Sequence, residues 1–480
     1  MTGADYTTVL PEIVMAVSVL ALLMIGVFKE KNSTSLVAWL SVGVMIACAI
    51  LVLMAPGERV VAFSGQFVSD PFSHFAKIII LAASAVGIIM SLSYIKREGM
   101  NRFEFPLLLL VSTLGMMMMV SANNLITLYM GLELQSLALY VVASFRRDTI
   151  RSTEAGLKYF VLGALSSGML LYGMSMIYGF AGTTSFDGIA AQFTDGSAPP
   201  IGLVVGIVFL CAGLAFKVSA VPFHMWTPDV YEGAPTPVTA FFAVAPKVAA
   251  IALFLRAMIG PFGDLVDQWQ QIIVFISLAS MVLGAVAAIN QTNIKRLMAY
   301  SSIGHMGFAL VGLAAGTEDG VRGVLVYMAI YLFMNVGTFA VILMMRQNDR
   351  MVENISDLAG LSRTKPATAM MLAILMFSMA GIPPLAGFFG KFFVFKAAID
   401  AGLVTLAVVG VLASVVGAFY YLRIIKLMYF DEPAERFDEP VGIALNGVMV
   451  VSSVVVIALF AFLGPLLSAA RFAASSLFGG

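Results

Sequence analysis

Apolar stretches about as long as a bilayer is thick recur along the whole sequence. A transmembrane helix needs roughly 20 apolar residues, and such stretches cover residues 9–28, 34–55, 72–95, 104–121, 123–145, 154–182, 201–221, 236–260, 270–290, 294–316, 322–346, 366–400, 402–430 and 441–465. In a bilayer core every backbone N–H and C=O must be hydrogen-bonded within the protein, and an α-helix does this alone. The sequence therefore predicts an all-α integral membrane protein with about fourteen transmembrane helices.

The composition excludes several classes of function. Of the 480 residues, 60% are hydrophobic and 11% charged, whereas soluble domains carry about 25% charged residues. The formal net charge is zero, which leaves no basic surface for nucleic acid. Cys48 and Cys211 lie far apart in apolar stretches, and no GxGxxG or GxxxxGK motif occurs. We therefore expect no nucleic-acid partner, no metal site and no cofactor bound by this chain.

The basic residues between the stretches predict the orientation in the membrane. Numbering the loops alternately, and assigning basic residues near the ends of several stretches to the adjoining loop, places 17 of the 27 Lys and Arg residues on one side and 4 on the other, and leaves 6 within the stretches. The larger group is Lys29, Lys31, Lys96, Arg97, Arg102, Arg146, Arg147, Arg151, Lys295, Arg296, Arg346, Arg350, Arg363, Lys365, Arg423, Lys426 and Arg436, and the smaller is Arg59, Arg256, Arg322 and Arg471. Because basic loops face the cytoplasm, we predict a multi-pass protein of a bacterial inner membrane with both termini on the periplasmic side.

Two stretches contain helix-breaking residues at matching places. Pro222 opens the run PFHMWTPDVYEGAPTPVT, and Gly381 opens GIPPLAGFFG. Interrupted helices in matching halves indicate inverted repeats, and the interruption falls in the fourth stretch of each of two five-stretch units. We expect three helices in residues 1–100, a first repeat in 104–260, a second, inverted repeat in 266–430, and a final helix and tail in 441–480. The alternative to interrupted helices in inverted repeats is that the prolines only kink packed helices.

Five ionisable residues lie deep inside the stretches: Glu133, Lys217, Lys247, His305 and Lys391. Lys247 lies about 11 residues, or roughly 16 Å, into its helix, near the middle of the bilayer core. An intramembrane charge costs at least about 2.5–3.5 kcal/mol, so such residues are expected to have a function. Pairing with a carboxylate favours the charged form of a lysine and burial opposes it. A row of such groups predicts a path that passes protons from one residue to the next.

Other ionisable residues lie nearer the ends of the stretches. Lys158 begins its stretch and either joins the relay or extends its amine to the membrane surface. His224 follows Pro222 and either supplies protons or caps the broken helix. Lys77 and Lys396 lie close to the outer ends of theirs, where reaching the surface suffices.

The residues around the breaks resemble a known family. Asp229-Val-Tyr-Glu-Gly-Ala-Pro-Thr-Pro, the run from Asn293 through Gly307, and Gly381–Lys391 resemble subunit N, an antiporter-like subunit of bacterial NADH–quinone oxidoreductase (respiratory complex I). The resemblance covers the whole chain. It implies that Glu133 pairs with Lys217, that Lys247 connects the two halves, that Lys391 lies near the proton exit, and that Lys158 matches a further family lysine.

The resemblance also implies the setting of the chain. It would be a proton-translocating subunit without a redox site of its own, driven by electron transfer from NADH through FMN and iron–sulfur clusters to quinone in partner subunits. Its partners would be other membrane-arm subunits, including further antiporter-like ones, and the lipid bilayer. Two alternatives remain from the residues alone: a subunit of a multisubunit sodium/proton antiporter, and a scaffold whose buried charges only hold helices together.

Overall fold

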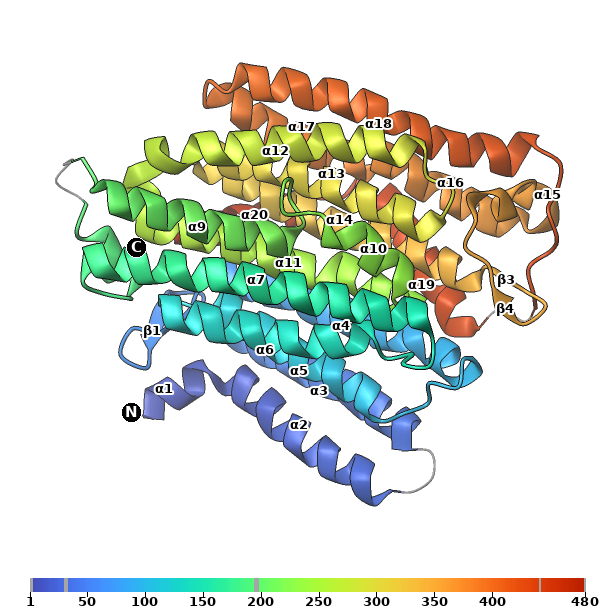
Figure 1. Ribbon diagram of the computed structural model, residues 1–480, viewed down its shortest axis with the longest axis horizontal. Coiled ribbons are helices and arrows are strands. Elements are labelled where there is room, and N and C mark those ends of the chain that lie inside the picture. Colours follow the sequence, from blue (N-terminus) through green and yellow to red (C-terminus); the bar gives the residue numbers. More distant parts are fainter. Residues whose placement is uncertain (1–2, 30–32, 194–197, 440–441, 479–480) are drawn as a thin grey trace.

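A computed structural model describes residues 3–29, 33–193, 198–439 and 442–478 of the chain. Long helices run nearly side by side along the horizontal axis of Figure 1. The helices are α1 (Gly3–Thr8), α2 (Leu10–Phe28), α3 (Ser33–Met54), α4 (Pro71–Arg97), α5 (Glu104–Val120), α6 (Leu125–Ala143), α7 (Ile150–Ala181), α8 (Phe186–Ala190), α9 (Ile201–Val218), α10 (Trp226–Gly233), α11 (Thr236–Phe262), α12 (Val266–Ile289), α13 (Ile294–Ala314), α14 (Glu318–Met344), α15 (Leu361–Thr364), α16 (Pro366–Ala380), α17 (Ala386–Asp400), α18 (Val404–Phe430), α19 (Ile443–Ala458) and α20 (Leu463–Phe478).

The strands are short and lie outside the bundle. β1 (Val60–Ala62) pairs with β2 (Phe67–Ser69), and β3 (Arg346–Gln347) pairs with β4 (Arg350–Met351), both antiparallel. Two 3₁₀ turns, η1 (Gly263–Leu265) and η2 (Ile355–Leu358), complete the described elements. Apart from these four short strands, the described elements are helices, many of them long and apolar enough to cross a membrane. The expectation of an all-α membrane protein is confirmed.

Length and composition identify the helices that can cross a membrane. Among the described residues, 10 helical segments qualify, or up to 11 when the bent pair α19 and α20 counts as one span. One of these segments runs from α11 through η1 into α12, and α5 and α16 are shorter apolar helices. The predicted stretch 366–400 consists of two helices, α16 and α17, separated by the break at residues 381–385.

The C-terminal region contains two helices that meet at a sharp bend. α19 ends at Ala458, and α20 follows at an angle of 87° to it. Pro465 lies in the first turn of α20, where the amide donor that proline lacks would have no helical partner. α20, most of which lies beyond the predicted stretch 441–465, packs on α4 and α14.

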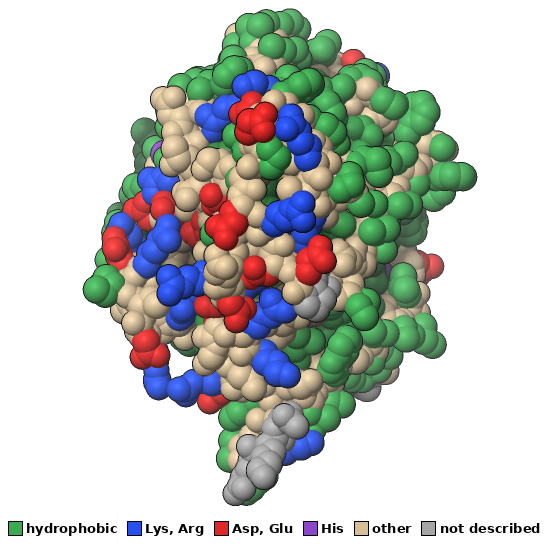
Figure 2. All heavy atoms as spheres, turned by 90° about the vertical axis from the view of Figure 1, so that its right-hand side faces the viewer, with side chains coloured by type: hydrophobic (Ala, Val, Ile, Leu, Met, Phe, Trp, Pro, Cys, Tyr) green, Lys and Arg blue, Asp and Glu red, His purple; other side chains and the backbone are tan. Residues whose placement is uncertain are grey.

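Both ends of the described chain lie at one end of the bundle, to the left in Figure 1. The opposite end carries β3, β4 and α15, and Figure 2 shows Lys, Arg, Asp and Glu side chains gathered over that face with apolar side chains around it. We call this face the charged end. Lys31, one of the basic residues placed on this side from the sequence, lies outside the described residues.

Both interrupted helices end in a left-handed residue. Ser219, the residue that caps the end of α9, has φ 63°, and Gly381, which caps the end of α16, has φ 86°. A left-handed residue terminates a helix and leaves its last carbonyls without helical partners. Ser219 and Ala380 are buried and Gly381 is half-buried, and Lys217 and Lys391 lie near these two helix ends.

Candidate functional site

Glu133 and Lys217 lie at the interface of α6, α7 and α9. Ser167 of α7 donates a very short hydrogen bond to Glu133 Oε1. Lys217 Nζ donates to Ser136 Oγ at 2.7 Å and to Tyr140 Oη at 3.3 Å. Glu133 and Lys217 are both described, and the expected direct ion pair between their side chains is absent. Ser136 and Tyr140 follow Glu133 on α6 by three and seven residues, so all three share one face of the helix. The Lys217 amine contacts that face at the two hydroxyl groups.

Lys247 of α11 caps the buried end of α9. Its Nζ donates to the Val218 carbonyl at 3.1 Å and forms a very short hydrogen bond with Ser219 Oγ. The amine also lies 5.2 Å from the centroid of the Trp226 ring. A helix C-terminus carries a partial negative charge. Lys247 is 1% exposed and has no carboxylate partner among the described residues. The C-terminal end of α9 therefore supplies the negative partial charge that faces its amine.

Lys391 has the same arrangement at the end of α16. Its Nζ donates to the carbonyls of Met379 and Ala380 at 3.1 and 3.0 Å, and to Ser414 Oγ at 2.8 Å. The ring of Phe308 lies 4.7 Å from the amine. Each interrupted helix thus presents its C-terminal carbonyls to one buried lysine, as half-helices in transporters do for cations.

His305 of α13 lies among hydroxyl groups. Its Nδ1 is 2.6 Å from Tyr327 Oη, and its Nε2 is 3.0 Å from Tyr421 Oη. The Tyr421 hydroxyl lies 2.5 Å from Ser301 Oγ. A neutral imidazole has one donor and one acceptor nitrogen, so one tyrosine donates to the ring and the other accepts from it. Such a chain can reverse its direction when a proton passes.

A small cavity joins His305 to Lys391. Both residues line it together with Ser301, Ser414 and Tyr421, and about 10 Å³ of its volume is open to the centre of a water-sized sphere. One buried water needs roughly this much room and two to four polar partners. Lys391 also lines a pocket of about 510 Å³ that opens between α17 and α18.

Lys158 does not lie with the buried group. Its side chain is 41% exposed and forms ion pairs with Glu154 and Asp229, each at 2.7 Å. Asp229 also binds Arg296 at 2.8 Å, and Arg296 binds Glu232 at 3.0 Å. These charges link α7, α10 and α13 at the charged end.

His224 lies in the turn between α9 and α10 and is half-buried. Its Nδ1 is buried and has no hydrogen-bond partner among the described residues. No hydrogen bond or ion pair among the described residues joins it to Lys217, Lys247 or Glu133, so its two expected roles stay open.

Sequence reasoning missed two kinds of residue. The first is the hydroxyl partners of the buried amines and of His305, which are Ser136, Tyr140, Ser219, Ser301, Tyr327, Ser414 and Tyr421. The spacing of Ser136 and Tyr140 from Glu133, and of Ser301 from His305, is a helical-face signal that could have identified some of them.

The second kind is buried ion pairs near the opposite end of the bundle. Lys77, expected to reach the surface, is 2% exposed and pairs with Glu12 at 2.7 Å. Arg256, expected in an outer loop, pairs with Asp70 at 2.7 Å, and both side chains are buried. The expectation for Lys77 was wrong because α3 packs on α4 and Glu12 of α2 pairs with the lysine amine inside the protein. Lys396 is 56% exposed and pairs with Asp400, as a surface lysine does.

Within the described residues, no group of three or more His, Cys, Asp and Glu side chains is arranged to hold a metal ion. Both cysteines are buried and unpaired. The chemistry that the described site supports is therefore hydrogen bonding and proton exchange among Lys, His, Glu, Tyr and Ser.

Family models match most of the chain. The model described as NADH:quinone oxidoreductase/Mrp antiporter, TM, matches residues 122–417. The model for the N-terminal part of NAD(P)H-quinone oxidoreductase subunit 2 matches residues 4–93.

Curated relatives identify the family. NADH-quinone oxidoreductase subunit N of Paramagnetospirillum magneticum is 62% identical over 478 residues, which is 99% of this chain and 98% of the relative. The chain belongs to the NADH-quinone oxidoreductase subunit N family. The protein of the same name from Rhodospirillum rubrum is 63% identical over 458 residues, 95% of this chain and 94% of the relative. The resemblance seen in the motifs is confirmed, as is the predicted function of a membrane subunit of this proton-translocating oxidoreductase.

Solved structures share the fold. A chain of respiratory complex I from Thermus thermophilus with bound aureothin has a TM-score of 0.82 and 30% identity, covering 95% of this chain and 98% of that one. A chain of the Mrp complex from Dietzia sp. has a TM-score of 0.88 at 22% identity, covering 100% and 98%. At that identity the second likeness shows the fold alone, so the sodium/proton antiporter reading has less support than subunit N.

Proposed function

We propose that this chain moves protons through Glu133, Lys217, Lys247, His305 and Lys391, with Lys158 and His224 on the side from which protons arrive. The observation that carries the proposal is the placement of Lys247 and Lys391 against the ends of two interrupted helices. Neither amine has a carboxylate partner within ion-pair distance in the described chain. Loss of a proton from either lysine therefore leaves no unpaired buried anion behind, which keeps the cost of exchange low.

Hydrogen bonds support two parts of the proposed path, at Lys217 and at His305. A proton taken up near Lys158 reaches Glu133 and Lys217, whose hydroxyl partners Ser136 and Tyr140 can pass it on. Lys247 receives it between the two halves. His305 exchanges protons with Tyr327 and Tyr421 and, through one water in the shared cavity, with Lys391. Release follows from Lys391.

The driving energy comes from outside the chain. We propose that partner subunits carry NADH, FMN, iron–sulfur clusters and quinone, and that this chain binds none of them. Neighbouring membrane-arm subunits, including further antiporter-like ones, would transmit the energy by changing the charge or position of groups that face Glu133 and Lys158. A like charge brought near a lysine expels its proton, and an opposite charge holds it.

The proposed membrane arrangement completes this picture. Fourteen spans would comprise three helices in residues 1–100, a first repeat in 104–260, an inverted repeat in 266–430 and a last helix within 441–480. The charged end would face the cytoplasm of a bacterial cell and both termini the periplasm, because basic loops are retained on the inner side. The matching breaks after α9 and α16 support the two inverted repeats.

The substitution Lys247→Met tests the relay in the assembled complex. Methionine keeps much of the volume and removes the proton-exchanging amine. We expect the number of protons moved per NADH oxidised to fall, with NADH–quinone turnover falling at least about tenfold if translocation is tightly coupled to it. The matched control is Lys396→Met, which removes an exposed lysine and should leave both quantities unchanged.

Unchanged proton stoichiometry and turnover in fully assembled Lys247→Met complex would refute the relay. A scaffold role predicts a different pattern, in which assembly decreases and turnover per assembled complex stays the same. Measuring complex content by the bound flavin separates these outcomes.

A further inference from the structure

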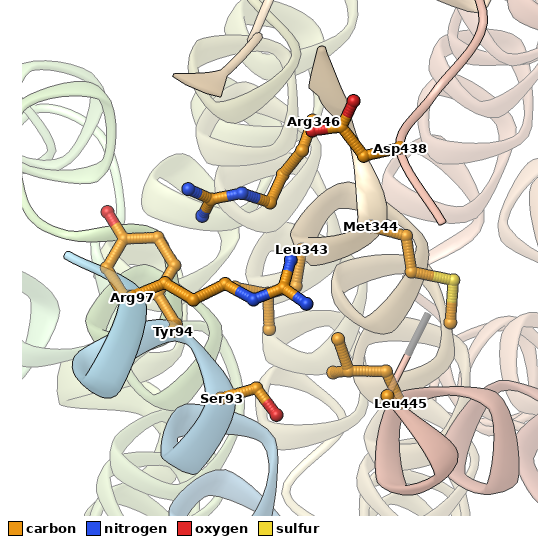
Figure 3. Close-up of a pocket in the computed structure, with 9 residues that line it drawn as sticks. Ser93, Tyr94, Arg97, Leu343, Met344, Arg346, Asp438 and Leu445 are labelled. Carbon is orange, nitrogen blue, oxygen red and sulfur yellow. The ribbon is translucent and has the colours of Figure 1, made fainter. Parts of the chain in front are cut away.

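A pocket at the charged end lies outside the proposed relay. It is formed by the end of α4, the end of α14 with Arg346, and the start of α19, and its lining includes Arg97, Leu343, Met344, Arg346, Asp438 and Leu445. Figure 3 shows the Arg97 side chain reaching across the opening toward Leu343, with Leu445 below it. About 30 Å³ is open to the centre of a water-sized sphere, which is room for roughly two or three oxygen-sized groups.

The two arginines that line the pocket differ in their partners. Arg97 is exposed and forms no ion pair or hydrogen bond with any described residue, although its guanidinium carries five donors. Arg346 is 6% exposed and binds Glu98 at 2.8 Å, yet its buried Nε has no hydrogen-bond partner among the described residues.

The nearby carboxylates are occupied elsewhere. Asp438 accepts hydrogen bonds from the backbone N–H groups of Asn348 and Asp349 at 3.0 and 2.8 Å. Glu98 binds both Arg146 and Arg346. An anion at Arg97 would therefore meet unpaired donors rather than a free carboxylate.

The remaining walls are apolar. Leu343, Met344 and Leu445 line the pocket beside Arg97, and Arg97 itself ends a helix long and apolar enough to cross the membrane. A ligand that fits has a phosphate for the arginine, which binds phosphate through two parallel N–H groups, and hydrocarbon for the leucines. Basic pockets between helices on the positively charged side of a membrane protein bind anionic lipid head groups.

We propose that this pocket binds the phosphate of one anionic phospholipid, with Arg97 as its main ligand. Because α4 belongs to the N-terminal helices while α14 and α19 come from late in the chain, the lipid bridges segments far apart in sequence. Its binding stabilises their packing, since any ligand of the folded state alone raises the apparent stability.

The test uses the purified complex in nanodiscs of phosphatidylcholine, with or without phosphatidylglycerol. We expect phosphatidylglycerol to raise the melting temperature of this subunit in the unsubstituted complex. Arg97→Gln should remove that increase and weaken retention of phosphatidylglycerol in native mass spectrometry by at least about tenfold, as loss of a charged hydrogen bond does. Arg97→Lys should keep part of the increase.

The control variant is Lys96→Gln, which removes a neighbouring exposed charge that does not line the pocket. It should respond to phosphatidylglycerol as the unsubstituted complex does. Equal responses of Arg97→Gln and Lys96→Gln would overturn the proposal. So would an equal increase produced by inorganic phosphate in phosphatidylcholine alone, because the site would then bind free phosphate. A photoreactive phosphatidylglycerol should label residues 93–97 or 343–346 of the unsubstituted chain, a readout that does not require a variant to fold.

Discussion

At the scale of single residues, buried lysines in this protein are held in two different ways. Lys247 and Lys391 face helix ends and hydroxyl groups, so each can change protonation without isolating a charged partner. Lys77 instead pairs with the carboxylate of Glu12, and both side chains are almost fully buried. A buried pair of this kind resists the loss of either charge. We infer that the first arrangement serves proton exchange and the second serves packing.

Lys77→Met should destabilise the protein by about 3–5 kcal/mol, because it leaves the buried carboxylate of Glu12 without a partner. Thermal unfolding in detergent measures the effect. The double variant Glu12→Gln/Lys77→Met should recover most of the lost stability, since no unpaired charge remains. Lys396→Met is the control, because its exposed pair with Asp400 contributes at most about 0.5 kcal/mol. A double variant no more stable than Lys77→Met would contradict this reading of the pair.

At the scale of elements, the interruption of α16 both ends the helix and positions the lysine. Gly381 has φ 86°, and a Cβ there would lie 3.0 Å from Lys391 Cδ and 3.1 Å from Nζ. Glycine is therefore needed for two separate reasons at this position: the left-handed backbone and the space that the lysine side chain occupies.

Gly381→Ala should cost about 1–2 kcal/mol from the left-handed backbone and should also displace Lys391, lowering proton translocation. Gly402→Ala is a matched control. Its φ is 81°, and nothing lies within 4 Å of a Cβ at that position, so it should cost similar stability without changing translocation. Proton uptake by inverted vesicles during NADH oxidation, compared at equal complex content, distinguishes the two. Equal translocation in both variants would show that displacement of Lys391 does not matter.

At the scale of the whole molecule, ion pairs at the charged end connect the first half of the chain to the second. Glu353, in the loop after β4, binds Lys295 at 2.8 Å and Arg151 at 3.4 Å, and accepts a hydrogen bond from Asn293. Burial by itself raises the pKa of Glu353, but the ion pair and hydrogen bonds with Lys295, and the contacts with Asn293 and Arg151, lower this pKa below its ordinary value of 4.5. Folding therefore favours the charged form.

The lowered pKa predicts how stability depends on pH. The contribution of Glu353 is fully present above about pH 4.5, and is lost as pH falls through the lower pKa of the folded state. Glu353→Gln should lower stability by about 2 kcal/mol at neutral pH and flatten the decline in melting temperature below pH 4.5. Glu432→Gln, at an 88% exposed carboxylate, should change neither. An acid decline that is as steep in Glu353→Gln as in the unsubstituted protein would exclude this residue as a cause.

The sequence by itself determined the fold class, the positions of the deep ionisable residues and the two helix breaks. Each of these depends on a local cost: a bilayer penalises unpaired backbone groups and charges wherever they occur, and proline or a left-handed residue ends a helix through its own backbone. The family was likewise readable from three short runs, two at the helix breaks and one from Asn293 through Gly307, because each combines polar, glycine or proline residues within an apolar sequence.

Only the tertiary structure decided which groups meet. Lys217 binds Ser136 rather than Glu133, and Lys77 turns inward to Glu12, because a partner depends on the rotation and spacing of neighbouring helices. Close packing sets that rotation: at Gly284 a Cβ would lie 2.7 Å from the backbone nitrogen of Gly304, so α12 and α13 approach as only small residues allow. A helical pattern identifies which residues share a face, whereas the residue opposite that face is determined by packing over the whole bundle.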